Sequence, residues 1–79
     1  MRINIDYFVT ELFKKETGMS FVDRAETIKG LNIDSIELVA LCMEVEEEYK
    51  IKINNEEVYV MMQGTVGDMI RAVEKKTKK

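Results

Sequence analysis

The sequence predicts an all-α domain built as a four-helix bundle, with three longer helices and one short helix. Apolar residues recur at helical spacing in four separate segments, capping residues precede these segments, and the 79-residue chain contains no proline. A chain of this length has room for one domain with one modest core. We place that domain at residues 1–74, followed by a basic C-terminal tail at residues 75–79.

The first helix is predicted from about Asn4 to Thr17, with Gly18 as its C-terminal stop. A long connection over residues 19–33 follows this helix. The core stripe of the first helix has the spacing of one buried helix face. The stripe consists of Ile5, Phe8, Val9, Leu12 and Phe13.

The connection after the first helix contains few periodic apolar residues. We expect an isolated turn near Ala25–Lys29. Two adjacent apolar residues, Phe21 and Val22, are expected to hold this loop against the core, because large apolar side chains gain most when they leave water.

The second helix is the strongest amphipathic segment and is predicted from Ser35 to about Tyr49. Asp34 is a good N-cap, and Glu37 stands three residues later, where the partner of a capping box belongs. Ser35 then occupies the first helical position with its hydroxyl unclaimed. The core stripe comprises Leu38, Leu41, Cys42, Val45 and Tyr49.

The third helix is short. It follows an extended joint at residues 51–53, is capped by Asn54 or Asn55, and continues to about Met62 before Gly64 ends it.

The fourth helix opens with a capping box in which Thr65 pairs with Asp68. Its inward side is expected to be apolar, whereas the lysines that follow it form a tail that we expect to be solvated and frayed. The inward residues are Val66, Met69, Ile70 and Val73, and the tail lysines are Lys75, Lys76, Lys78 and Lys79.

Charge is distributed unevenly along the chain. The net charge is −3, but residues 34–57 hold eight acids and two lysines, a local charge of −6. A nucleic-acid-binding protein needs a basic folded face, so this class is excluded. No apolar run reaches the length of a membrane span and no signal-peptide pattern opens the chain, so a cytoplasmic protein is expected.

Enzymatic and metal-binding classes are poorly supported. The chain has no histidine, so neither a Ser-His pair nor a His-assisted cysteine can form, and zinc would lack all but one of its usual ligands. Glycine-rich phosphate loops are also absent. The single cysteine, Cys42, lies on the core stripe and is expected to be a small buried apolar side chain.

Four stretches of the sequence together resemble the acyl carrier protein family, whose Asp-Ser-Leu motif carries a 4′-phosphopantetheine arm on the serine. The stretches are Ile28–Val39, which contains Asp34-Ser35-Ile36, then Glu46–Tyr49, Ile51–Glu57 and Thr65–Ile70. The resemblance implies a four-helix bundle of the acyl-carrier type that has no catalytic activity of its own. It also implies a covalent 4′-phosphopantetheine on Ser35, beside Asp34.

The same resemblance implies a monomer that carries acyl intermediates as thioesters in fatty-acid, polyketide or related biosynthesis. Its partners would be a phosphopantetheinyl transferase and acyl-transferring or synthase enzymes with basic docking patches. Two alternatives stay open: a peptidyl or aminoacyl carrier of a nonribosomal pathway, and a helical interaction module that binds a basic partner without a covalent cofactor.

Several positions depart from the family pattern. Ile36 replaces the usual leucine, Asn32 stands where glycine is common, Ala40 occupies a position that is often acidic, and Asn54 replaces a usual proline. These differences make a specialised pathway a competitor of primary fatty-acid synthesis.

A helical wheel separates a second apolar patch from the core stripe of the second helix. An apolar patch bordered by carboxylates on an exposed helix face is typical of a docking surface. The alternative is that these residues cover the edge of the core and the glutamates only solvate the helix. The patch centres on Ile36 and Met43, with Ala40, and its rim consists of Glu37, Glu44, Glu47 and Glu48.

The family often shelters its acyl chain between the second and third helices. The flexible methionines of this chain could form such a space, or could simply fill a small core loosely. The residues concerned are Val58, Val60, Met61 and Met62, with Met69 adding to the wall.

Overall fold

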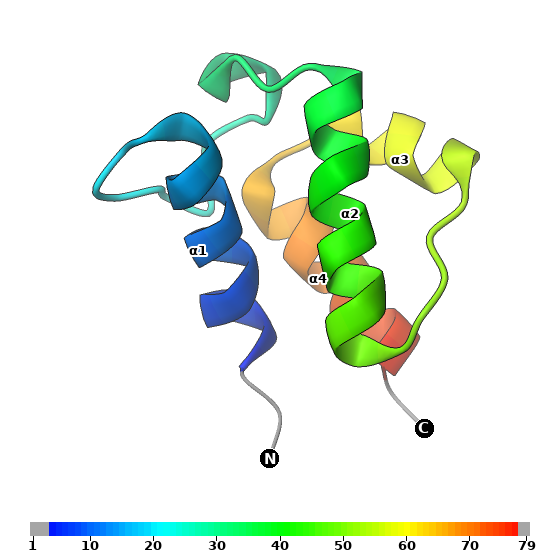
Figure 1. Cartoon of the computed structure of the whole chain (residues 1–79). Helices are drawn as coiled ribbons and strands as arrows, with labels where there is room; N and C mark the ends of the chain where they lie inside the picture. The colour runs from blue at the N-terminus through cyan, green and yellow to red at the C-terminus, as the bar shows by residue number, and fades with distance from the viewer. Residues whose placement is uncertain (1–3, 78–79) are drawn as a thin grey trace.

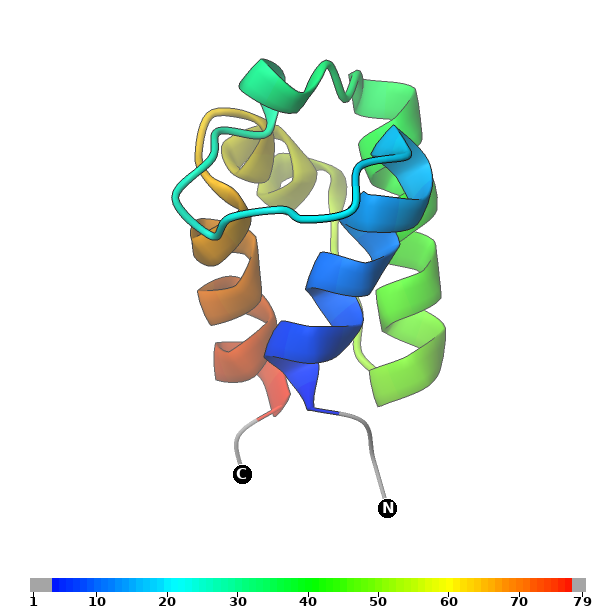
Figure 2. The same cartoon turned by 90° about the vertical axis from the view of Figure 1, so that its left-hand side faces the viewer.

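The computed structural model describes residues 4–77 and places four α-helices around one core. Helices α1, α2 and α4 run roughly along one axis, and the short α3 lies across one end of the bundle beside α2 (Figures 1 and 2). A 3₁₀ turn, η1, precedes α2. The bounds are α1 Ile5–Thr17, η1 Lys29–Leu31, α2 Ser35–Tyr49, α3 Asn55–Met62 and α4 Val66–Thr77.

The predicted helix starts, and the predicted stop of α1 at Gly18, are confirmed because their capping contacts are local. Asn4 caps α1, and Gly18 follows it in the left-handed conformation at φ 76°. Asn54 caps α3 through a capping box with Glu57, since each backbone N–H donates to the side chain of the other residue. The expected box between Thr65 and Asp68 is present as well, with hydrogen bonds of 2.9 and 3.0 Å.

Gly64 does not form the end of α3, which stops at Met62 with Gln63 as its C-cap. A Cβ added at Gly64 would lie 2.5 Å from an oxygen of the Asp68 carboxylate. A side chain at position 64 would have to displace this carboxylate, which takes part in the capping box of α4.

The connection between α1 and α2 differs from the expectation in two respects. The single turn expected near Ala25–Lys29 is split into a turn at residues 24–25 and the 3₁₀ helix that starts at Lys29. Val22 is buried as expected, but Phe21 is 68% exposed, so its predicted anchoring role was wrong. Only one of these two neighbouring side chains faces the core.

The basic tail is only partly separate from the bundle. Helix α4 continues to Thr77 and includes Lys75 and Lys76, so frayed structure was a wrong expectation for these residues. The Lys76 ammonium pairs with the Glu57 carboxylate of α3 at 2.6 Å. Lys78 and Lys79 lie outside the described residues.

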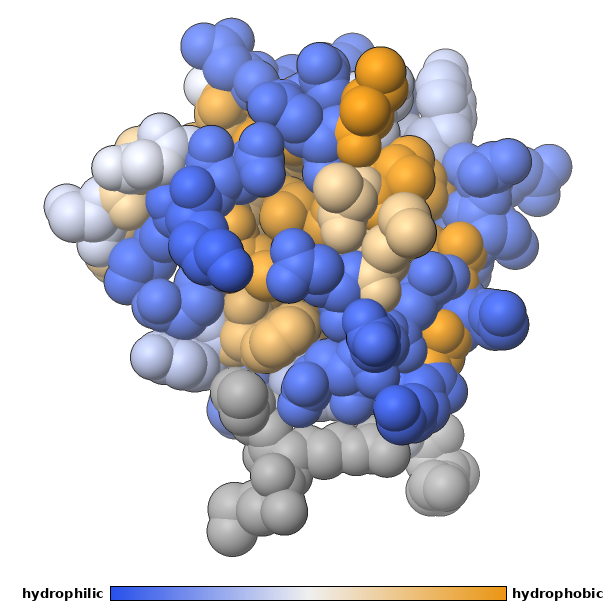
Figure 3. Space-filling model, viewed as in Figure 1, coloured by the Kyte–Doolittle hydropathy of each residue, from blue (hydrophilic) through white to orange (hydrophobic). Residues whose placement is uncertain are grey.

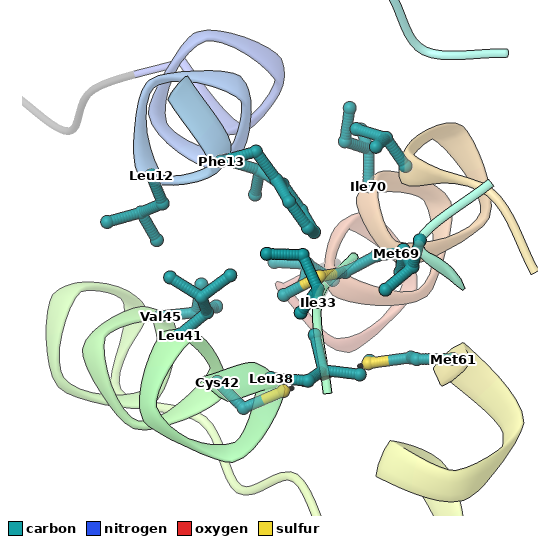
Figure 4. Packing of buried hydrophobic residues seen from close by; sticks show 14 of the residues in the cluster. Leu12, Phe13, Ile33, Leu38, Leu41, Cys42, Val45, Met61, Met69 and Ile70 are labelled. Carbon is teal, nitrogen blue, oxygen red and sulfur yellow. Dashed lines mark hydrogen bonds between the residues drawn. The ribbon is translucent and has the colours of Figure 1, made fainter. Parts of the chain in front are cut away.

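The core lies where α1, α2 and α4 face one another (Figure 4). Phe13 of α1 points toward Met69 and Ile70 of α4, and these three side chains are fully buried. The predicted inward residues of α2 and α4 are all buried, because each helix turns its apolar stripe toward the core. They are Leu38, Leu41, Cys42, Val45 and Tyr49 in α2, and Val66, Met69, Ile70 and Val73 in α4.

Candidate functional site

The head of α2 is held by a capping box. Asp34 adopts an extended conformation, and its Oδ1 accepts a hydrogen bond of 2.8 Å from the Glu37 backbone N–H. In return, the Asp34 backbone N–H donates to Glu37 Oε1 at 2.9 Å. This exchange satisfies the backbone N–H groups of Asp34 and Glu37 at the start of the helix. Both carboxylates are therefore engaged in hydrogen bonds within the first turn.

Ser35 is the first residue of α2 and is exposed. Among residues 4–77 its hydroxyl takes part in no hydrogen bond, because Asp34 has taken the capping role. The helix behind it is 15 residues long, and the positive end of its dipole favours a negatively charged group at this position. The hydroxyl is therefore accessible, unclaimed and placed where a phosphodiester is stabilised.

Buried residues on both sides fix the position of Ser35. Ile33 is 4% exposed just before the cap, and Leu38 is fully buried one turn into the helix. Asn32 lies in the left-handed region at φ 61°, a conformation that asparagine tolerates better than most residues. An isolated bridge between Thr27 and Thr65 ties this connection to the start of α4. The serine thus lies between residues that are anchored in the core.

The predicted docking patch is exposed on α2. Ile36 is 79% and Met43 60% exposed, and Ala40 between them is exposed as well. Figure 3 shows this apolar surface over the upper part of α2, with hydrophilic surface around it. Of the predicted carboxylate rim, Glu44 and Glu47 are exposed and Glu37 and Glu48 are half-buried.

Sequence reasoning missed two residues of this surface. Val39 is 40% exposed and lies between Ile36 and Met43, as its i+3 spacing from Ile36 could have shown. Glu16 reaches the surface from the end of α1, and no local sequence signal connects it to α2. Loss of hydration raises the pKa of Glu16, and the neighbouring Glu37 carboxylate raises it further, followed by the charges of Asp34 and Glu44.

The Cys42 thiol is buried in the core, where burial raises its pKa to about 12. Its Sγ lies 3.8 Å from the Met61 sulfur and joins α2 to α3. A thiol in this environment stays protonated and unreactive. The described residues also contain no group of three His, Cys, Asp or Glu side chains that could hold a metal ion.

The residues expected to shelter the acyl chain differ in their burial. Val58, Met61 and Met69 are buried in the core, but Val60 is 67% exposed, so its place in a wall between α2 and α3 was wrong. Val60 and Met61 instead border a groove of about 670 Å³ between α3 and α4, whose other side includes Ala72.

Comparison with known proteins identifies the family of the chain. Residues 8–73 match a family described as "Phosphopantetheine attachment site". The chain is a member of the acyl carrier protein family. Its fold is similar to the crystal structure of an acyl carrier protein from Thermotoga maritima, with 33% sequence identity, a TM-score of 0.72, and coverage of 86% of this chain and 80% of that chain. No curated protein matches the sequence.

Membership of the acyl carrier family accounts for the architecture of the site. The protein is a carrier rather than an enzyme, and its domain is of the kind that holds 4′-phosphopantetheine covalently. No helix among residues 4–77 combines the length and the apolar character that crossing a bilayer requires. The exposed hydroxyl at the head of α2 meets the geometric requirement of this cofactor, since attachment needs a reachable nucleophile and a place for one phosphodiester charge.

Proposed function

We propose that Ser35 is the attachment residue, and that this cytoplasmic, monomeric carrier holds acyl intermediates for partner enzymes of fatty-acid, polyketide or related biosynthesis. The observation that carries the proposal is the Ser35 hydroxyl, which is exposed and makes no hydrogen bond with residues 4–77 at the N-terminus of a 15-residue helix. When bound, 4′-phosphopantetheine supplies a thiol on a flexible arm, and an acyl group is held there as a thioester.

The residues around Ser35 have separate tasks in this proposal. The N-terminal turn of α2 stabilises the charge of the phosphodiester through its dipole and its unpaired backbone N–H groups. Asp34 keeps the helix start in place through its hydrogen bond to the Glu37 N–H, and so leaves the serine oxygen available.

Partner recognition in this proposal belongs to the exposed face of α2. The phosphopantetheinyl transferase and the acyl-transferring or synthase enzymes would present basic patches to Glu44 and Glu47. The apolar centre at Ile36 and Met43 would then leave water on contact. Charge complementarity accelerates encounter, and burial of the apolar centre slows dissociation.

Loading with coenzyme A and a broad-specificity phosphopantetheinyl transferase tests the attachment. Intact mass should increase by one arm in the wild-type protein and in Ser20→Ala, but not in Ser35→Ala. These are the two serines of the chain, so the pair of variants assigns the modification. Modification that persists in Ser35→Ala, or failure of the wild type with several transferases, contradicts the proposal.

A further inference from the structure

Met43 is the most exposed methionine among residues 4–77, and it lies in the apolar patch on α2. Its side chain is 60% exposed, whereas Met61 is 4% exposed and Met69 is fully buried. The side chains of Met61 and Met69 point toward the other core residues in Figure 4. A dissolved reagent therefore reaches the side chain of Met43 far more readily than the methionines of the core.

The other sulfur-containing residues of the described chain differ from Met43 in burial or in position. Cys42 precedes it in α2, but this side chain is only 3% exposed, and burial raises the pKa of the thiol to about 12. A thiol that stays protonated reacts slowly with oxidants. Met62 is half-buried, and Met19, 40% exposed, lies in the loop after α1. Among residues 4–77, only Met43 combines an accessible sulfur with a place in the docking patch.

An accessible thioether reacts with hydrogen peroxide. The sulfur attacks one peroxide oxygen, so that an S–O bond forms while the O–O bond breaks, and the departing hydroxide takes the proton of the transferred oxygen and leaves as water. The sulfur loses two electrons and the peroxide gains them. The product, methionine sulfoxide, is polar and uncharged. Methionine sulfoxide reductases restore the thioether with electrons from a dithiol, which becomes a disulfide as water is released.

Oxidation of Met43 would change the surface of α2 and leave the core unchanged. The helical period places this residue on the side of α2 that faces away from the buried Leu41 and Val45. The sulfoxide oxygen would be hydrated in the free carrier. A partner that covers Ile36 and Met43 would remove this hydration, and burial of a polar group without a hydrogen-bond partner opposes binding.

We propose that Met43 is a redox-sensitive site, at which reversible oxidation by hydrogen peroxide weakens the docking of partner enzymes on α2. The proposal rests on the proposed carrier function, because these partners are the transferase and the synthase enzymes that would contact this face. Glu44 and Glu47 keep their charges after oxidation. Electrostatic steering of basic partners therefore persists, while the contact with the apolar centre becomes weaker.

Controlled oxidation of the purified protein tests this site. After brief treatment with hydrogen peroxide, peptide mass mapping should find the added oxygen at Met43 and Met19 and not at Met61 or Met69. Loading by the transferase, at a carrier concentration below KM, should become roughly tenfold slower, as expected for about 1.4 kcal/mol of uncompensated polar burial. The dependence of the rate on salt should be unchanged. Methionine sulfoxide reductase with dithiothreitol should restore the original rate.

Two leucine variants assign the effect to one residue, because leucine is close to methionine in volume and has no sulfur. The ratio of the loading rates after and before oxidation should be near one for Met43→Leu, and about one tenth for Met19→Leu and the wild type. An equal loss of rate in Met43→Leu and the wild type overturns the proposal. So does an unchanged rate in wild-type protein that is oxidised at Met43, or a Met43 that resists the peroxide.

Two further measurements separate this effect from other failures. Melting temperatures before and after oxidation should agree, and unfolding of the wild type on oxidation of Met43 would also overturn the proposal. Loading of the untreated wild type, compared with untreated Ser35→Ala, reports on the carrier function alone. Failure of the carrier function is therefore distinguished from insensitivity of the docking face to oxidation.

Discussion

The Glu57 carboxylate lies 2.6 Å from the Lys76 ammonium and ties the first turn of α3 to the last turn of α4. Helix α3 has only eight residues, of which two are buried. Because short helices depend on tertiary contacts for their stability, this ion pair and the Cys42–Met61 contact hold α3 against the rest of the bundle.

Replacing Lys76 with an uncharged residue should weaken the attachment of α3 to α4. The hydrogen bond from Lys76, together with the backbone hydrogen bond at Asn54, lowers the pKa of Glu57. A lowered folded-state pKa contributes stability above the ordinary glutamate value, and this stability is lost as the pH falls through the folded-state value. Both side chains are about one third exposed, so we expect Lys76→Gln to reduce the unfolding free energy by up to about 1 kcal/mol at neutral pH.

Urea denaturation at pH 7 and pH 3 measures this effect. The deficit of Lys76→Gln should shrink at the lower pH, because protonation of Glu57 removes its charge from the ion pair. Lys75→Gln is the matched control, because Lys75 precedes Lys76 in the same helix and forms no ion pair within residues 4–77. Equal losses in the two variants would show that the Glu57 contact does not stabilise α3.

A second prediction concerns Glu16. Loss of hydration and the neighbouring Glu37 raise the pKa of Glu16, so the folded protein favours the protonated form of this side chain. The stability of the folded protein therefore declines as the pH rises from the ordinary glutamate pKa through the raised pKa of Glu16. Glu16→Gln should therefore melt at a higher temperature than the wild type at pH 7, and the gain should disappear at pH 3. Thermal unfolding at the two pH values measures both effects.

Removal of a negative charge near any helix C-terminus also relieves an unfavourable dipole interaction. Glu74→Gln controls for this effect, since Glu74 lies near the end of α4 as Glu16 lies near the end of α1. A gain of equal size in Glu74→Gln would mean that proximity to Glu37 contributes nothing.

A third prediction tests whether Asp34 does more than cap α2. Asp34→Ala removes the side-chain acceptor of the Glu37 N–H and should cost about 1 kcal/mol of stability. Asp34→Asn keeps an oxygen acceptor and should retain most of that stability, because Asn and Asp are similarly good N-caps. If the transferase recognises the negative charge of Asp34, the Asp34→Asn variant will be folded but loaded more slowly than the wild type. Loading at the wild-type rate would restrict Asp34 to its capping role.

The structural elements followed from the sequence because their determinants are local. Each capping box joins residues three positions apart, so the sequence contains the whole interaction. The core stripes follow from the helical period in the same way. The boxes at Asp34 and Glu37 and at Thr65 and Asp68 were predicted for this reason, whereas the cap of α3 was left open between Asn54 and Asn55.

Two of the misjudged positions depended on contacts between distant segments. Whether Phe21 or Val22 faces the core is decided by the path of the loop beside α1. Likewise, Glu16 approaches Glu37 only when α1 packs beside α2. Neither relationship leaves a periodic or local signal. Val60 is different, because it lies two positions after the buried Val58, so the helical period already places the two side chains on opposite sides of α3.

The last prediction concerns the docking face of α2. Glu44 and Glu47 are the best residues for charge reversal, because both are exposed. Glu37 takes part in the capping box, so its replacement would also weaken the helix. Glu44→Lys with Glu47→Lys should slow loading by the transferase and make the remaining rate less sensitive to salt, since electrostatic steering acts on association. Met43→Lys should slow loading more than either single reversal, because it places a charge in the apolar centre of the contact.

Loading rates measured at several ionic strengths, with helical content monitored by circular dichroism, distinguish docking from misfolding. Glu74→Lys is the matched control, since it reverses an exposed glutamate of α4 that lies outside the patch. A reduced rate with unchanged salt dependence in the α2 variants would indicate that shape rather than charge is recognised there. Loading of the α2 double variant at the wild-type rate across ionic strengths would place the recognition surface elsewhere on the protein.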